Sequence, residues 1–199
     1  MALSVVCFVA LLGGCTGSKT ATMADLVNVN GYSWYEYRSS NTPIQDMDGN
    51  VYSNIHYVYE FNNTTFDNAA ARHVKITQSY GNITYVRNYY LNTVGDTLLD
   101  GGWARIVDNK TVREQNYSSQ QISYIADANL YFGTFWNDTL TKSGVESLTV
   151  NGKSYNCDVY KVKRDNHEYS FWFDPKVPVP LKMHVFDTDE TYELVDWGQ

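Results

Sequence analysis

The stretch VESLTVNGKSYNCDVYKVKRDNHEYSFWFD, residues 145–174, indicates the fold of this 199-residue chain most clearly. Apolar and polar side chains alternate through 145–150 and 154–163, and alternation with a period of two is typical of strands. Between them, Asn151-Gly152 is the strongest short signal for a tight hairpin. A second polar turn leads into 167–174. The stretch therefore predicts consecutive antiparallel strands.

The same pattern continues on both sides of this stretch. It recurs at 179–186 and 191–197, and upstream at 32–38, 51–61, 72–79, 82–90, 103–107 and 111–117. In 51–61, one face would carry Val51, Ile55, Tyr57, Tyr59 and Phe61. Strands twist, so a meander of this length curls. We predict a mainly β (α+β) domain built on a strongly curved antiparallel sheet.

Alternation fails between residues 118 and 140, where Ile122, Ile125 and Leu130 fall on a loosely helical spacing. Asn68–Ala71 is a second, shorter helix candidate. We expect one or two short helices to cover the concave face of the sheet. No linker rich in Pro, Gly or Ser interrupts 25–199, which we predict to be a single domain.

The N-terminus contains an apolar run, ALSVVCFVALL at 2–12, that is shorter than the roughly 20 residues needed to span a bilayer. It matches the apolar part of a signal peptide, although no Lys or Arg precedes it. The following Gly13-Gly14-Cys15 resembles a lipobox. We expect a signal peptide at 1–14, then lipidated Cys15 and a flexible tether over 15–24. An uncleaved anchor or a core strand is the alternative.

Composition and charge narrow the classes of partner. The chain has 22 Asp and Glu against 15 Lys and Arg, a formal net charge of −7, and no run of basic residues. Nucleic-acid binding depends on basic side chains, so we expect no such partner. Export would place the domain in the cell envelope, on the outer face of the membrane. The lipid anchor must hold the domain at the membrane, because an anionic membrane surface repels an acidic domain.

The C-terminal meander carries a family resemblance. Its motifs are Tyr169-Ser170-Phe171-Trp172-Phe173-Asp174-Pro175 and Pro180-Leu181-Lys182-Met183, followed by a polar turn and a last aromatic strand. This arrangement resembles the LolA/LolB-type lipoprotein-carrier superfamily, over 32–199 in outline and over 153–197 in its residues. The resemblance implies a half-barrel around short helices, with a cavity that binds an acyl chain or hydrophobic peptide tail without covalent chemistry or a cofactor.

Aromatic side chains on the strands are the candidate ligand contacts, and 17 of the 199 residues are Tyr. A Tyr-rich surface suits an amphipathic ligand better than a bare acyl chain. Plain packing of a core is the alternative. The residues expected on the concave face are Trp34, Tyr57, Tyr59, Phe171 and Phe173.

Two other functions stay open at this point. A structural or interaction domain would have a filled core and would contact other envelope proteins. An envelope hydrolase would need clustered Asp, Glu and His, which sequence alone does not reveal.

No catalytic, cofactor or metal site is predicted. The four histidines lack the spacing of zinc ligands, and Asp46–Asn50 has its Gly too early for a calcium loop, which favours a surface turn. Cys157 lies in an alternating run and is expected to be a buried thiol; a reactive thiol or one that pairs between chains is the alternative. Six sequons could accept N-glycans: Asn62, Asn63, Asn82, Asn109, Asn116 and Asn137.

Overall fold

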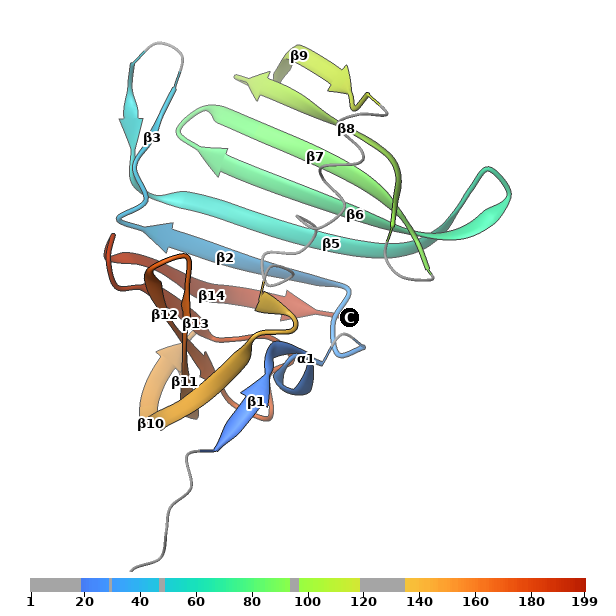
Figure 1. The fold of residues 1–199 in the computed structure, drawn as a ribbon. Coiled ribbons are helices and arrows are strands. Elements are labelled where there is room, and N and C mark those ends of the chain that lie inside the picture. Colours follow the sequence, from blue (N-terminus) through green and yellow to red (C-terminus); the bar gives the residue numbers. More distant parts are fainter. Residues whose placement is uncertain (1–18, 29, 47–48, 94–96, 119–134) are drawn as a thin grey trace, which may run out of the picture.

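The computed structural model describes residues 19–28, 30–46, 49–93, 97–118 and 135–199. Its main feature is a 12-stranded sheet in the order β1-β10-β11-β12-β13-β14-β2-β5-β6-β7-β8-β9, with β3 and β4 as a separate hairpin (Figure 1). All neighbours are antiparallel. The elements are β1 (Thr20–Thr22), α1 (Met23–Leu26), β2 (Trp34–Ser40), β3 (Ile44–Gln45), β4 (Val51–Tyr52), β5 (Ile55–Phe66), β6 (Ala69–Tyr80), β7 (Ile83–Asn92), β8 (Leu98–Val107), β9 (Lys110–Asn116), β10 (Thr139–Val150), β11 (Lys153–Arg164), β12 (His167–Phe173), β13 (Lys182–Val185) and β14 (Glu190–Gly198).

The sheet consists of two meanders that meet at one seam. Strands β5 to β9 follow one another, as do β10 to β14, and the last strand pairs with β2 so that Leu194 lies opposite Tyr37. Figure 1 shows that β10 and β11 run across the direction of β5 and β6, so the sheet twists along its length. The two edge strands, β1 and β9, do not pair with each other, and the sheet is open. The prediction of a mainly β, antiparallel domain is confirmed.

Two-residue turns fix the register of the hairpins. Asn151 and Gly152 have φ values of 50° and 72°, as a tight hairpin turn requires, and they join β10 to β11. Asp108-Asn109 and Asp165-Asn166 have the same left-handed backbone at their turns. Asn, Asp and Gly adopt this backbone at low cost. The turns predicted on either side of 154–163 are therefore confirmed.

Two local predictions in the first meander are wrong. Asn68–Ala71 is not a helix, because Asp67 and Asn68 have φ values of 48° and 63° and form the turn between β5 and β6. The run 51–61 is not one strand, since β4 ends at Tyr52 and β5 begins at Ile55. Val51, predicted to share the face of Ile55, is 64% exposed.

The start of the domain also differs from the prediction. Thr20–Thr22 pairs with β10, and a capping box between Thr22 and Asp25 starts α1. Met23 is fully buried in the core. The folded domain therefore includes residues that we assigned to the tether. The other predicted helix, within 118–140, lies largely outside the described residues.

One face of the sheet carries most of the large buried side chains. We call it the inner face and define it by Tyr35 and Tyr37 on β2 and the residues in register with them. The opposite, outer face carries Trp34, Glu36 and Arg38 on the same strand. In the described part of the chain, no helix is long and apolar enough to cross a membrane.

Candidate functional site

The floor of the inner face is a cluster of tyrosines. Tyr35 lies opposite Tyr59 in the β2–β5 register, and their rings stack with centroids 4.7 Å apart. The Tyr37 hydroxyl donates a hydrogen bond to the Pro180 carbonyl. Burial raises the pKa of all three hydroxyls. These side chains are core, which places Tyr59, one of the predicted ligand contacts, beneath any binding surface.

An open groove lies over the inner face of β12, β13 and β14. It has a volume of about 390 Å³ and a base of aromatic and aliphatic side chains. The Phe135 and Tyr169 rings meet edge to face, with centroids 4.8 Å apart. At the polar rim, the Tyr192 hydroxyl donates to Glu190 over 3.2 Å. The groove is lined by Phe135, His167, Tyr169, Val185, Thr188, Glu190 and Tyr192.

Tyr57 extends this groove onto the first meander. Its ring centroid lies 6.0 Å from that of Tyr192, and the side chain is half-buried. Burial, reinforced by Tyr192, raises the pKa of the Tyr57 hydroxyl, and the positive charge of Arg87 opposes that shift. Arg87 donates to the Gln78 side-chain oxygen over 3.1 Å. Tyr57 therefore joins the apolar groove to a polar surface on β6 and β7.

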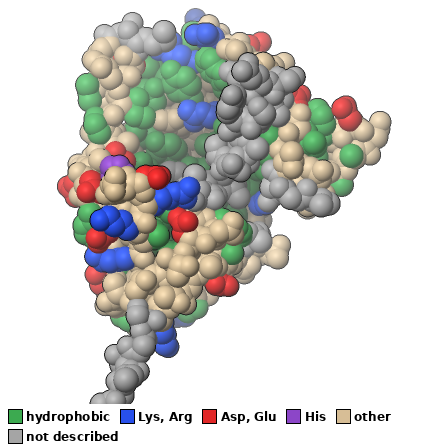
Figure 2. All heavy atoms as spheres, in the orientation of Figure 1, with side chains coloured by type: hydrophobic (Ala, Val, Ile, Leu, Met, Phe, Trp, Pro, Cys, Tyr) green, Lys and Arg blue, Asp and Glu red, His purple; other side chains and the backbone are tan. Residues whose placement is uncertain are grey.

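Beyond Arg87, basic and aromatic side chains alternate across β7, β8 and β9. The register places Arg87 opposite Trp103, and Arg105 opposite both Tyr85 and Arg113. The Arg113 guanidinium lies over the Trp103 ring, 5.3 Å from its centroid. Figure 2 shows hydrophobic side chains with Lys and Arg among them in a hollowed part of the molecular surface. No run of basic residues in the sequence indicates this grouping.

The other three predicted contacts lie in different surroundings. Phe171 and Phe173 are on the inner face of β12 and are buried in the core. Trp34 is on the outer face, because it pairs with Glu60 while its neighbour Tyr35 pairs with Tyr59. Of the five residues, only Tyr57 combines the inner face with partial exposure. Sequence reasoning missed Tyr169 and Tyr192, whose position beside Tyr57 depends on the β14–β2 seam.

Cys157 is buried and forms no disulfide. Burial, followed by the negative charges of Asp174, Asp158 and Glu146, raises the pKa of its thiol to about 11. The thiol is therefore protonated at neutral pH, which makes it a poor nucleophile.

The four histidines each have a separate polar partner rather than a common ligand site. His56 lies 3.1 Å from Glu36, and His167 lies 3.2 Å from Asp187. His73 lies 3.0 Å from the side-chain oxygen of Asn88 and stacks on Tyr90. Within the described residues, no three His, Cys, Asp or Glu side chains are grouped so as to hold a metal ion.

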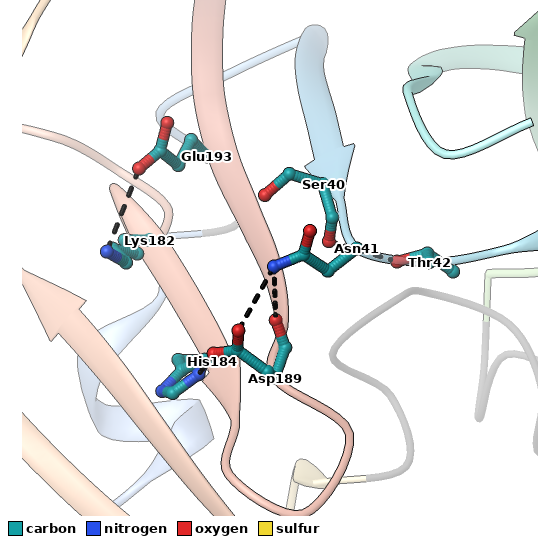
Figure 3. Close-up of polar contacts among 7 residues, drawn as sticks. All are labelled: Ser40, Asn41, Thr42, Lys182, His184, Asp189 and Glu193. Carbon is teal, nitrogen blue, oxygen red and sulfur yellow. Dashed lines mark hydrogen bonds and ion pairs between the residues drawn. The ribbon is translucent and has the colours of Figure 1, made fainter.

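His184 belongs to a polar cluster that fastens a turn to the seam of the sheet (Figure 3). Its Nε2 lies 3.0 Å from Asp189 Oδ1. Asn41 donates to the carboxylate and to the backbone carbonyl of the same aspartate, over 3.1 and 3.2 Å. The Asp189 side chain is 78% exposed. The two hydrogen bonds from Asn41 hold the β13–β14 turn against the end of β2, whereas the His184 contact lies within the β13–β14 hairpin. We assign this cluster a structural role.

The remaining predicted sites are at the surface or outside the described residues. All six sequon asparagines are exposed: Asn62, Asn63, Asn82, Asn109, Asn116 and Asn137. Asp46 accepts hydrogen bonds from Asn50, at the position where the sequence favours a surface turn over a calcium loop. The signal peptide and Cys15 lie outside the described residues.

A scan against protein-family models finds no match, and a search of curated proteins finds none either.

Proposed function

We propose that this protein is an exported, membrane-anchored lipoprotein that binds an apolar or amphipathic component of the cell envelope. Its open sheet would be a half-barrel of the LolA type, with the ligand held on the inner face without covalent chemistry. The observation that carries the proposal is the groove between Tyr169, Val185 and Tyr192, which continues over half-buried Tyr57.

The chemistry of this groove suits a chain-like ligand. Burial of an acyl chain is worth about 0.8 kcal/mol for each methylene group removed from water. Aromatic rings supply apolar area, while tyrosine hydroxyls offer hydrogen bonds to a more polar portion of the same ligand. Amphipathic molecules therefore fit better than purely apolar ones.

The proposed anchor would hold the sheet close to the membrane. Four residues separate Cys15 from Thr20, the first residue of β1. At roughly 3.5 Å per residue, an extended link of this length spans only about 17 Å over its five peptide steps. A lipidated Cys15 would keep the β1 edge next to the lipid headgroups, where a membrane ligand is available.

Native mass spectrometry of the full chain, isolated from membranes of a related host, tests the proposal. We expect a reproducible extra mass that solvent extraction removes and that identifies the class of ligand. A bare protein mass, together with no uptake of added lipid, would overturn the proposal. Contacts with envelope proteins, the alternative function, would then be sought by crosslinking.

A pair of tyrosine variants tests the location of the site. Tyr57→Ala should weaken binding of the fluorescent apolar probe N-phenylnaphthylamine at least several-fold. Tyr90→Ala is the matched control, because Tyr90 is also half-buried but lies on the outer face, stacked on His73. Equal effects of the two substitutions would exclude the inner face as the site.

A further inference from the structure

Arginines are distributed unevenly over the two faces of the sheet. The chain has six arginines, and four of them lie on strands β6 to β9. They are Arg72, Arg87, Arg105 and Arg113. The register places all four on the inner face. Arg87 continues the row of Tyr59 across the sheet, and Arg105 and Arg113 continue the row of Tyr57. Arg72 pairs with Asn63, which lies two residues along β5 from Phe61 and so on the same face.

None of these four arginines forms an ion pair with an acidic side chain among the described residues. The inner-face positions of β5 to β9 carry no Asp or Glu in the described part of the chain. Other cations of the sheet do have such partners. Lys75 lies 2.7 Å from Glu60, and Lys182 lies 3.7 Å from Glu193. A protein with a net charge of −7 thus has a positive area on one face.

Neutral neighbours hold the arginines in place. Gln78 accepts a hydrogen bond from Arg87, and the Trp103 ring supports Arg113. Arg105 Nε is buried and has no hydrogen-bond partner among the described residues. Buried polar groups are normally satisfied, so this guanidinium has unused capacity for an acceptor. Arginine matches carboxylate and phosphate oxygens with two parallel hydrogen bonds.

We propose that Arg87, Arg105 and Arg113, here called the basic cluster, bind the anionic headgroup of a membrane amphiphile whose tail runs over Tyr57 toward the groove of β12 to β14. The inference rests on the proposed function and adds the charge and orientation of the ligand. Glu190 at the groove rim repels an anion, so the headgroup lies at the opposite end of the surface. Four strand spacings separate β14 from β7, roughly 19 Å along the sheet.

Matched amphiphiles with the same tail test the charge of the headgroup. Dodecyl phosphate, neutral dodecyl maltoside and cationic dodecyltrimethylammonium are titrated below their micelle concentrations, with displacement of N-phenylnaphthylamine as the signal. We expect the full chain to bind dodecyl phosphate about tenfold or more tightly than dodecyl maltoside or dodecyltrimethylammonium. One charge-assisted hydrogen bond is enough to give a difference in affinity of this size. Inorganic phosphate at the same concentrations should not compete with dodecyl phosphate.

Arginine variants test the basic cluster itself. Arg113→Gln, at an exposed position, and Arg105→Gln should each weaken dodecyl phosphate binding about tenfold and leave dodecyl maltoside binding unchanged. Arg38→Gln is the control, because it removes the same charge from the outer face of β2. Thermal melting checks that each variant is folded. If Arg105→Gln does not fold, the binding measured for Arg113→Gln alone tests the basic cluster.

The possible outcomes distinguish a failure of this inference from a failure of the proposed function. Equal affinity for the anionic and neutral probes, or preference for the cationic one, overturns the anionic headgroup while binding on the inner face stands. Competition by inorganic phosphate at the same concentrations as dodecyl phosphate overturns the amphiphile in favour of a free-anion site. Binding of none of the three amphiphiles overturns both the inference and the proposed function.

Discussion

Arg105 and Arg113 lie directly opposite each other on β8 and β9, two like charges in one cross-strand pair. Lys182 and Glu193 occupy the same relationship on β13 and β14, with opposite charges 3.7 Å apart. Opposite charges in such pairs stabilise a sheet, and like charges destabilise it. The arginine pair is thus a local cost to the free protein, and it becomes favourable when an anion binds between the two side chains.

Substitution of Arg113 tests this cost in the ligand-free protein. We expect Arg113→Glu to be the most stable form, Arg113→Gln intermediate and the wild type least stable, with about 0.2–1 kcal/mol between steps. Salt should reduce the differences, since both side chains face solvent at least in part. Urea unfolding at low and high ionic strength measures the order. A wild type as stable as Arg113→Glu at low salt would show that the pair carries no repulsion.

The hydrogen bond from Tyr37 to the Pro180 carbonyl should contribute strongly to stability, because both residues are buried. Tyr37→Phe leaves that carbonyl without this donor, at an expected cost of about 1–3 kcal/mol in the free energy of unfolding. Tyr90→Phe, which removes a hydroxyl from a half-buried ring on the outer face, should change it by less than about 0.5 kcal/mol. Similar losses for both variants would argue against a special role for the buried bond.

The sequence was informative about strands and turns because both depend on local chemistry. Asn151-Gly152 and Asp165-Asn166 favour a left-handed backbone wherever they occur, and the alternation around them assigns residues to two faces. Asp67-Asn68 carries the same signal, but the alanines that follow it have high helix propensity and misled the prediction. Pairing of β6 with both neighbours overrides that propensity.

The candidate site was much harder to predict, because it depends on which strands become neighbours. Glu36 and Arg38 share the face of Trp34, so the alternation itself already indicates that Trp34 points outward. No such local signal exists for the basic cluster. Arg87, Arg105 and Arg113 are scattered along the chain, and only the register of three strands brings them together.

The β5–β6 turn offers a test of the local backbone. Asn68 has a φ of 63°, which costs an ordinary L-residue roughly 1–2 kcal/mol. Asn68→Ala should therefore lower the free energy of unfolding by about 1 kcal/mol, while Asn68→Gly, which adopts this backbone freely, should be neutral within about 0.5 kcal/mol. Thermal and urea unfolding measure both. An alanine variant as stable as the glycine variant would contradict the left-handed turn.

The raised pKa of the Cys157 thiol should make the stability of the protein depend on pH in the alkaline range. Its pKa in the folded protein is about 11, above the ordinary value of roughly 8.5, so folding favours the protonated thiol. The stability from this difference is complete below about pH 8.5 and is lost as pH rises toward 11. The wild type should therefore lose more stability than Cys157→Ala between pH 8 and pH 11, although buried tyrosines destabilise both. Iodoacetamide should label Cys157 quickly only after urea unfolding; rapid labelling of the folded protein at pH 8 would show that the thiol is accessible and reactive.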